Sequence, residues 1–467
     1  MDEAFREELR NGLVGLLGNE RVHWRKEDLL PYTADAYVGT IRRSLDLTYF
    51  PDFVVLPEST EQVQAVVKLA AKHEVPLLAK GGGSNLSGAL LPLTGGIVVD
   101  TIKMNRVIEV NVPNLYVTTQ PGITLKELDE KLAEHGLTLN QVQGSYKVAT
   151  VGGSISTAGF ARKHQKYGVI SDRVMSLEVV LADGRVLRTG PKVLYTSTGY
   201  RLHQMFIGAE GTLGIITEAT LRVEPIPEAS AAIIAYFDDF HTALHAAVSI
   251  LGSCVTYLGI ELFDIPEPGD YGAPEGKETA LLIDFEGIKG EVEAAEEYVR
   301  RLIVGVGGTC GDPESARALV REYTMRWCGA RPVTGLEEGL TTYVPTERIE
   351  EFYRILWEDI MPRHGILAVR GTSHDVDMGR YRMAYAQFKI GDGEEALKRY
   401  TQAADEAMAL AVSMGGSMST CVGVGIKLVD KMSLEYSETA LDVMRRLKKA
   451  LDPDCIMNPG KKLPEKP

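Results

Sequence analysis

The segment Lys80-Gly81-Gly82-Gly83-Ser84-Asn85-Leu86-Ser87-Gly88 decides how this sequence is interpreted. It directly follows the apolar residues 76–79, which indicate a buried strand. Glycines let backbone N–H groups turn toward a ligand, and consecutive N–H groups form a concave anion site suited to a diphosphate. The segment is not a GxGxxG dinucleotide fingerprint, because Leu86 stands where the third glycine belongs. It is not a P-loop either, because no Lys-Ser or Lys-Thr pair follows Gly88.

Two further glycine-rich stretches occupy residues 151–159 and 208–217. Each of the three stretches, taken alone, is more often a tight turn than a ligand site. Together, with Ser, Thr and Asn side chains interleaved among the glycines, they favour one extended cofactor that carries phosphates.

Length and composition limit the class of protein. At ~150 residues per domain, 467 residues predict two or three domains. A formal net charge of −14 argues against general nucleic-acid binding. No apolar run approaches the ~20 residues that cross a bilayer, and residues 1–10 lack the apolar core of an export signal. The cysteines are odd in number, widely spaced and without a CxxC pair, which favours reduced thiols in the cytoplasm over disulfides or an iron–sulfur site.

Strand and helix signals alternate through the first half of the chain. Ser59 and Thr124 each stand three residues before Gln or Glu, which predicts the starts of two amphipathic helices. Asp183-Gly184 predicts a hairpin turn. We therefore expect an α+β fold with two domains and a C-terminal segment that returns to the first domain. The expected boundaries are residues 1–225, 226–415 and 416–467.

The order of several short motifs resembles the FAD-binding domain of the vanillyl-alcohol oxidase superfamily. The similarity is greatest to the branch that contains the glycolate oxidase flavin subunit, D-lactate dehydrogenase and D-2-hydroxyglutarate dehydrogenase. The resemblance covers residues 50–225 and the tail, and it implies a two-domain FAD-binding fold of the p-cresol methylhydroxylase type with an α+β cap domain. The motifs that carry it are Pro51-Asp52 to Ala65, Lys80 to Gly88, Pro121-Gly122, Thr150 to Gly153, Lys166-Tyr167-Gly168, Thr198-Gly199-Tyr200, Gly208 to Pro225, Leu451-Asp452-Pro453 and Asn458-Pro459-Gly460-Lys461.

The resemblance also implies how FAD is held. The first loop would bind the diphosphate through backbone N–H groups, and Asn458 would return from the tail toward the isoalloxazine. In some members a histidine of the first loop tethers the flavin, but residues 80–88 contain neither His nor Cys, so we expect non-covalent FAD. The residues expected to contact FAD are Lys80, Gly81, Gly82, Gly83, Ser84, Asn85, Ser87, Pro121, Gly122, Thr150, Gly152, Gly153, Ser156, Gly159, Glu210, Gly211, Gly214, Ile215, Ile216 and Asn458.

The chain departs from this branch where its members bind a metal. Relatives carry a GHxGDGNxH-like motif and a later Ser-Gly-Glu-His-Gly-like motif, which supply metal ligands and a histidine base. In the segment that corresponds to the first motif, His374 matches one histidine and Tyr381 stands at the other position. In the second, Cys421 and Val422 replace the glutamate and the histidine. One remaining ligand does not hold a divalent ion, so we predict no metal site and no base at position 422.

Four residues of the second domain are candidates for catalysis: His374, Tyr381, Tyr385 and Arg370. His374 or one of the two tyrosines could take a proton from the substrate, and Arg370 could anchor a carboxylate through two hydrogen bonds. For each of them, a structural or solvated side chain is the competing interpretation.

The resemblance implies an FAD-dependent dehydrogenase that oxidises a 2-hydroxy acid or related alcohol by hydride transfer to flavin N5. We expect the electrons to pass to an electron-transfer flavoprotein or an iron–sulfur subunit, because the chain carries no second redox centre; a homodimer is compatible with the sequence. Two alternatives stay open. One is a non-redox flavin transferase resembling alkyldihydroxyacetonephosphate synthase, and the other is a non-catalytic flavin-binding subunit of a complex.

Overall fold

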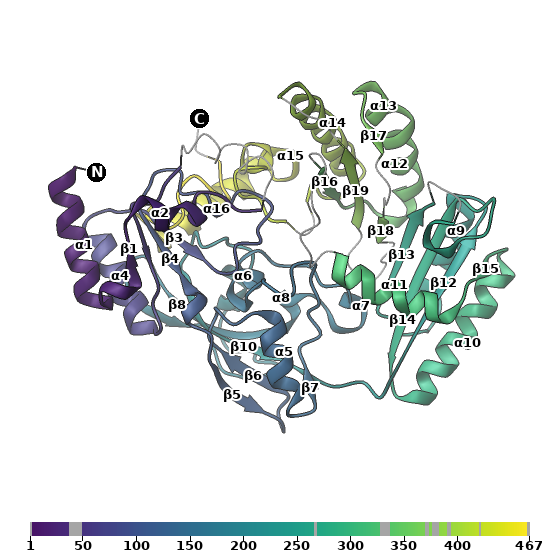
Figure 1. The fold of residues 1–467 in the computed structure, drawn as a ribbon, viewed down its shortest axis with the longest axis horizontal. Coiled ribbons are helices and arrows are strands. Elements are labelled where there is room, and N and C mark those ends of the chain that lie inside the picture. Colours follow the sequence, from purple (N-terminus) through teal and green to yellow (C-terminus); the bar gives the residue numbers. More distant parts are fainter. Residues whose placement is uncertain are drawn as a thin grey trace.

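The computed structural model describes residues 2–36, 49–265, 269–326, 337–368, 373–375, 383–389, 394–419 and 422–464. Two sheets of four and five strands and a short two-stranded pair belong to the first half of the chain, and an eight-stranded sheet belongs to the second half. In Figure 1 the first-half elements lie at the left and centre and the eight-stranded sheet lies at the right. The arrangement is the predicted α+β architecture.

The first sheet positions the loop at residues 81–88. Its strand order is β1 (Val22–His23), β2 (Phe53–Val55), β4 (Ile97–Asp100) and β3 (Leu77–Lys80), and the last three strands are parallel. Helices α1 (Glu3–Leu17) and α4 (Thr60–Lys72) pack against this sheet in one apolar core. The Ser59 side chain caps α4 by accepting a hydrogen bond from the Gln62 N–H, as predicted. Because β3 ends at Lys80, the loop begins at the carboxyl end of a parallel strand, which is where open parallel sheets bind ligands.

The second sheet is antiparallel. Its strand order is β5 (Val107–Asn111), β6 (Tyr116–Thr119), β10 (Ile215–Arg222), β8 (Val174–Val180) and β9 (Val186–Arg188). Helix α5 (Leu125–Ala133) packs on one face, and Thr124 and Glu127 form the predicted capping box at its start. The predicted hairpin at Asp183-Gly184 joins β8 to β9, and Gly184 has the positive φ of +78° that such turns favour.

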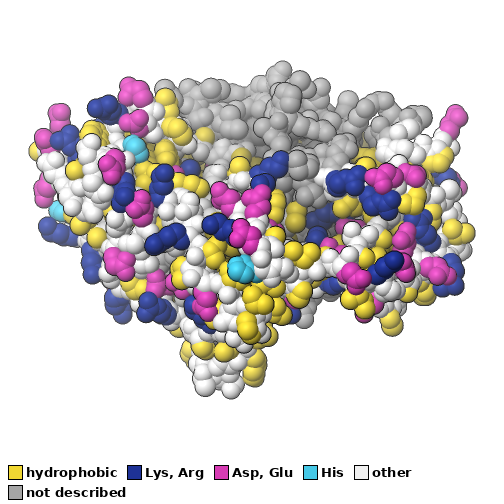
Figure 2. Space-filling view, turned by 60° about the horizontal axis from the view of Figure 1, so that its bottom comes forward, with side chains coloured by type: hydrophobic (Ala, Val, Ile, Leu, Met, Phe, Trp, Pro, Cys, Tyr) yellow, Lys and Arg dark blue, Asp and Glu magenta, His cyan; other side chains and the backbone are white. Residues whose placement is uncertain are grey.

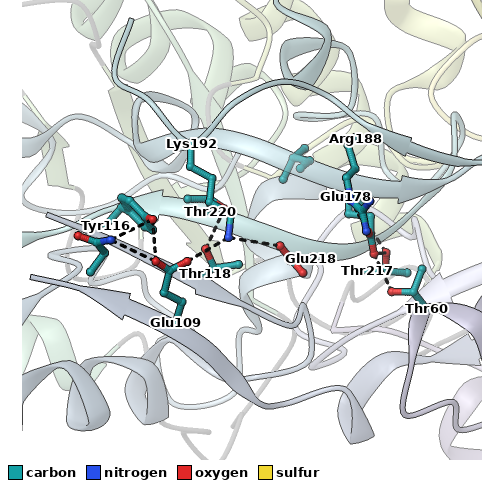
Figure 3. Close-up of polar contacts among 12 residues, drawn as sticks. Thr60, Glu109, Tyr116, Thr118, Glu178, Arg188, Lys192, Thr217, Glu218 and Thr220 are labelled. Carbon is teal, nitrogen blue, oxygen red and sulfur yellow. Dashed lines mark hydrogen bonds and ion pairs between the residues drawn. The ribbon is translucent and has the colours of Figure 1, made fainter. Parts of the chain in front are cut away.

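The other face of the second sheet carries paired polar side chains (Figure 3). Glu109 accepts a hydrogen bond from the Tyr116 hydroxyl at 2.7 Å and lies 3.2 Å from the Lys192 ammonium. Glu178 accepts a hydrogen bond of 2.7 Å from Thr60, the first residue of α4. Glu178 therefore links the second sheet to the helix that packs on the first.

The eight-stranded sheet is antiparallel throughout. Its strands, in order, are β15 (Thr309–Cys310), β12 (Ala229–Phe237), β14 (Thr279–Gly287), β13 (Gly259–Asp264), β18 (Ser373–Asp375), β19 (Met383–Lys389) and β16 (Glu337–Thr342), with β17 (Leu367–Ala368) paired to β19. The large apolar core on one face contains residues of α9 (Phe240–Leu251), α10 (Lys289–Gly305), α12 (Ile349–Ile355) and α14 (Glu394–Ser413). Helix α11 (Pro313–Arg326) packs on the opposite face, which we call the cavity face.

Residues after α14 return to the first half of the chain. Helix α16 (Glu438–Leu451) contributes Leu447 and Leu451 to the core beneath the second sheet. Beyond it, the Leu77 N–H donates to the Ile456 carbonyl at 2.7 Å, and the Asn458 N–H donates to the Leu77 carbonyl at 2.7 Å. The tail therefore pairs with the strand that leads into the glycine-rich loop.

The remaining α-helices and the short strand pair connect these layers. The pair consists of β7 (Leu137–Thr138) and β11 (Glu224–Pro225). The helices are α2 (Lys26–Leu29), α6 (Val151–Ser156), α7 (His164–Tyr167), α8 (Ile170–Arg173), α13 (Met361–Arg363) and α15 (Met432–Glu435). None of the helices in the described ranges is both long enough and apolar enough to cross a membrane. Acidic and basic side chains are intermixed over the coloured part of the face in Figure 2.

Candidate active site

A cavity of about 670 Å³ lies where the three glycine-rich stretches meet the eight-stranded sheet. Loop residues 80–86, residues 142–162 and residues 210–216 contribute most of its described lining, and Glu261, Thr341 and Val422 contribute from the second half of the chain. The volume lies within the range of typical cofactor and ligand sites. The predicted residues found in this lining are Lys80, Gly81, Gly82, Gly83, Ser84, Asn85, Pro121, Thr150, Gly152, Gly153, Ser156, Gly159, Glu210, Gly211, Gly214, Ile215 and Ile216.

Glycine is required in the first loop because the loop packs directly on the residues that precede the second glycine-rich stretch. A Cβ atom on Gly82 would lie 1.7 Å from the Val148 carbonyl oxygen, and one on Gly81 would lie 2.2 Å from the Thr150 hydroxyl. Gly83 has a φ of +75°, which L-amino acids with side chains rarely adopt. The loop can therefore present its backbone to the cavity while its other side rests on residues 148–150.

The second stretch forms a short helix, α6, in place of the tight turn that its glycines favour. The helix starts because the Thr150 hydroxyl accepts a hydrogen bond from the Gly153 N–H at 3.2 Å. Gly152 is packed so closely on Pro121 that a Cβ atom would lie 2.5 Å from the proline ring. Local capping and the proline contact outweigh the low helix propensity of two glycines.

Lys80 and Glu210, which the first domain contributes to the lining, both form polar contacts with other protein groups. The Lys80 ammonium lies 3.3 Å from the Asp100 carboxylate, which also accepts a hydrogen bond from the Tyr32 hydroxyl at 2.9 Å. Burial, together with the Asp100 charge, raises the pKa of Tyr32 far above its ordinary value. The buried Glu210 carboxylate accepts hydrogen bonds from the N–H groups of Val424 (2.6 Å) and Gly425 (2.8 Å). These groups hold the cavity walls together.

Three of the predicted cofactor contacts lie outside the lining. The Ser87 carbonyl accepts from the Ile426 and Lys427 N–H groups, and a Cβ atom on Gly122 would lie 1.9 Å from the Thr101 carbonyl oxygen. The Asn458 side-chain amide donates to the carbonyls of Ala89 at 3.1 Å and of Glu210 at 2.8 Å. Ser87, Gly122 and Asn458 thus contact backbone groups next to the cavity and do not belong to its described lining.

Strand register separates two of the catalytic candidates. Position 385 pairs with Thr341, which lines the cavity, and position 374 pairs with Leu262, which lies in the apolar core on the opposite face. Paired positions of neighbouring strands lie on the same face of a sheet. The register therefore places position 385 on the cavity face and position 374 on the other face. Arg370 and Tyr381 lie outside the described residues.

The structure adds two charged residues that the sequence did not indicate, Arg162 and Glu261. Arg162 lies 3.6 Å from Glu261 and 3.1 Å from Asp284, and all three side chains are buried. Arg162 lies close to Gly159 in the sequence, and this proximity to the second glycine-rich stretch is a weak signal that Arg162 belongs to the site. No local pattern marks Glu261, because its partner is distant in the chain. Over the described ranges, no cluster of three or more His, Cys, Asp or Glu side chains is arranged to hold a metal ion.

Comparison with known proteins assigns the chain to a family. The FAD binding domain model matches residues 51–190, and the model of the C-terminal domain of FAD linked oxidases matches residues 226–462. The glycolate oxidase subunit GlcD of Bacillus subtilis is 29% identical over 91% of this chain and 93% of its own length. The D-lactate dehydrogenase of Archaeoglobus fulgidus is 31% identical over 87% of this chain and 90% of its own length.

A solved structure shows the same fold. p-Cresol methylhydroxylase with substrate bound superposes with a TM-score of 0.80 at 18% identity, covering 99% of this chain and 97% of that one. The predicted two-domain fold, the predicted FAD cofactor and the resemblance to the glycolate oxidase and D-lactate dehydrogenase branch are thereby confirmed. The chain belongs to the FAD-linked oxidases and is an FAD-dependent oxidoreductase of the glycolate oxidase and D-lactate dehydrogenase type.

Proposed function

We propose that this protein oxidises a 2-hydroxy acid or a related alcohol and passes the electrons to a separate acceptor protein. The observation that carries the proposal is the composition of the cavity wall. One continuous cavity is lined by the three glycine-rich stretches and by Glu261, Thr341 and Val422 of the second half of the chain. A substrate held against the second group of residues would lie beside a cofactor held against the first.

The described lining fits FAD. Gly81 and Gly82 are crowded on their protein side, so their backbone is held in place without a ligand. We propose that the predicted residues found in the lining contact FAD, and that Ser87, Gly122 and Asn458 support those contacts from behind. The described lining contains neither His nor Cys, which supports a dissociable flavin. Bound FAD would supply the hydride acceptor.

The protein's own groups bind and orient the substrate. Position 385 lies on the cavity face beside Thr341, which supports Tyr385 over His374 as the residue that binds the substrate hydroxyl and whose ionised phenolate oxygen would receive its proton, leaving a neutral phenol. Arg370 remains the proposed anchor of a substrate carboxylate, and Tyr381 remains a second candidate for the proton. The departures at Cys421 and Val422 support a reaction without a metal ion.

Anaerobic titration of the FAD-loaded protein tests the proposal. We expect one member of a panel of 2-hydroxy acids, alcohols and phenols to abolish the absorption of oxidised flavin, and an electron-transfer flavoprotein or iron–sulfur protein to restore it. Turnover that needs no acceptor and ends with oxidised flavin would indicate a non-redox transferase. No response to any compound, with a complex recovered by pull-down, would indicate a non-catalytic subunit.

The acceptor and the location are parts of the same proposal. An electron-transfer flavoprotein or an iron–sulfur subunit is favoured because the sequence contains no motif for a second redox centre. The described cysteines Cys254, Cys310 and Cys455 are free thiols, which supports a cytoplasmic location.

A further inference from the structure

Phe160 is the only aromatic residue in the described lining of the cavity. It directly follows Gly159, the last residue of the second glycine-rich stretch, and it is half-buried. The proposed contacts with FAD and the proposed proton transfer do not use this side chain. An aromatic ring offers a large and rigid apolar surface with few rotatable bonds. Phe160 is therefore a candidate for apolar contact with a bound molecule.

The Phe160 ring packs on the imidazole of His164. The two ring centroids lie 4.6 Å apart, and the ring planes are inclined at 48°. His164 is 5% exposed, and its Nδ1 lies 2.9 Å from the Ala161 carbonyl oxygen. A carbonyl oxygen can only accept, so Nδ1 carries a proton and donates it. Burial lowers the pKa of His164 to about 4, so the imidazole is uncharged at neutral pH. The Phe160 ring thus rests on a fixed and neutral group.

Close packing also holds the backbone on both sides of Phe160. A Cβ atom on Gly159 would lie 2.4 Å from the Gln143 side-chain amide nitrogen. The Arg162 N–H donates to the Val142 carbonyl at 3.0 Å. Val142 and Gln143 belong to the described lining as well, so these contacts tie Phe160 to the neighbouring part of the wall. The ring is therefore held in place before any ligand binds.

The segment that carries Phe160 lies against the eight-stranded sheet. The Arg162 guanidinium donates to Asp284 of β14 at 3.1 Å. A Cβ atom on Gly259, the first residue of β13, would lie 3.1 Å from the Arg162 carbonyl oxygen. Glu261, two residues further along β13, lines the cavity. Phe160 thus belongs to the part of the first-domain wall that meets the second half of the chain, where the proposed function puts the substrate.

We propose that Phe160 is a specificity-determining residue that binds the apolar side chain of the substrate. The proposal rests on the proposed oxidation of a 2-hydroxy acid or related alcohol, and it narrows the substrate to molecules with an aromatic or extended aliphatic side chain. Such a side chain would be removed from water against the ring, and the favourable free energy grows with the apolar area buried. A substrate without an apolar side chain, such as glycolate, gains nothing from this contact.

Binding of unreactive acids to the FAD-loaded protein tests this directly. Propionate and 3-phenylpropionate lack the hydroxyl group, and they differ by one phenyl group. We expect the wild-type protein to bind 3-phenylpropionate more tightly than propionate by about 10-fold or more, measured by calorimetry or by the change in flavin absorption. In Phe160→Ser this ratio should fall by about 5-fold or more. Lactate and 3-phenyllactate should show the same change in kcat/KM, chiefly through KM.

Two further variants give the controls. Phe160→Leu keeps an apolar side chain, so the ratio should stay within about 3-fold of wild type. Val148→Ser removes a different apolar side chain of the described lining, which is 49% exposed and belongs to the residue whose carbonyl lies against Gly82 in the first loop. That ratio should stay within about 2-fold of wild type, because the loop is the proposed phosphate site. An equal fall in either control and in Phe160→Ser would show that a general disturbance of the wall changes selectivity, and would overturn the proposal.

The remaining outcomes separate this inference from the proposed function. A wild-type protein that does not prefer 3-phenylpropionate overturns the inference, even if Phe160→Ser cannot be purified. A ratio that rises in Phe160→Ser would show that the ring limits the size of the side chain, and it also overturns the inference. If no hydroxy acid or alcohol reduces the flavin but the ratio falls in Phe160→Ser alone, the proposed oxidation is wrong and the apolar selection stands. If lactate or 3-phenyllactate reduces the flavin but the ratio is unchanged in Phe160→Ser, the proposed oxidation stands and the apolar selection is wrong.

Discussion

The Lys461 ammonium donates a 2.6 Å hydrogen bond to the Leu91 carbonyl, although the two residues are 370 positions apart in the chain. Lys461 is 4% exposed, and Leu91 lies in the loop region that follows the first glycine-rich stretch. Three residues earlier, the Asn458 amide bonds Ala89 in the same region. The C-terminal tail therefore holds the outer side of the loop whose inner side lines the cavity.

Lys461 should make stability depend on pH. Burial lowers its pKa from 10.5 to about 8, and Asp35 and Glu210 act in the opposite direction. The pKa of Lys461 is lower in the folded protein than in the unfolded chain, so the folded protein loses the Lys461 proton at a lower pH. The contribution of Lys461 to the free energy of unfolding therefore rises as pH increases from about 8 to about 10.5. The full difference is on the order of 3 kcal/mol. In Lys461→Met this rise should be absent, which the apparent Tm of the FAD-loaded proteins at pH 7 and pH 10 would show. Parallel pH profiles of the two proteins would contradict it.

Asn458→Ala should weaken FAD binding without removing a group from the cavity lining. The substitution leaves the buried carbonyls of Ala89 and Glu210 without their side-chain donor, and each such loss costs about 1–3 kcal/mol. We expect the Kd for FAD, measured by quenching of flavin fluorescence, to rise about 10-fold, the equivalent of about 1.4 kcal/mol. Asn114→Ala, at an exposed turn, is the matched control and should bind FAD as wild type does. Equal affinity in Asn458→Ala and wild type would show that the tail does not support the loop.

Gly82→Ala should abolish FAD binding. The added methyl group would lie 1.7 Å from the Val148 carbonyl oxygen, so the loop or the preceding segment must move. Gly15→Ala is the control, because position 15 lies within helix α1 and nothing lies within 4 Å of its added Cβ. That change should leave the flavin content intact and stabilise the helix by up to about 1 kcal/mol. A yellow Gly82→Ala protein with wild-type flavin content would refute the assigned role of the loop.

Tyr385→Phe should lower the rate at which substrate reduces the flavin. His374→Gln should leave this rate within about 3-fold of wild type, which corresponds to a change of less than about 1 kcal/mol in the activation barrier. The reason is the register, which places position 385 beside Thr341 on the cavity face and position 374 beside Leu262 on the opposite face. Loss of a proton-transfer group typically lowers the rate about 10²–10⁴-fold. Stopped-flow measurement of the reductive step under anaerobic conditions distinguishes the two positions. The reverse order of effects would restore His374 as the base.

Local features of the fold can be predicted from the sequence. The caps at Ser59 and Thr124 and the turn at Asp183-Gly184 depend on hydrogen bonds and backbone angles within a few residues, and all three occur as expected. The helix at Val151–Ser156 is not predicted, because glycine propensity argues against it and the contact of Gly152 with Pro121 that stabilises it is not local.

The sequence by itself predicted one phosphate-bearing cofactor and marked three glycine-rich stretches as its expected binding site, because the capacity of backbone N–H groups to bind phosphate depends on residue types and their spacing. Only the tertiary structure decided that Arg162 meets Glu261, that Asn458 lies behind the loop, and that positions 374 and 385 lie on opposite faces of one sheet. Those relationships join segments far apart in the chain, and they depend on strand register and on domain packing. Register and packing are set by the burial of whole sheet and helix faces, and no short sequence motif specifies them.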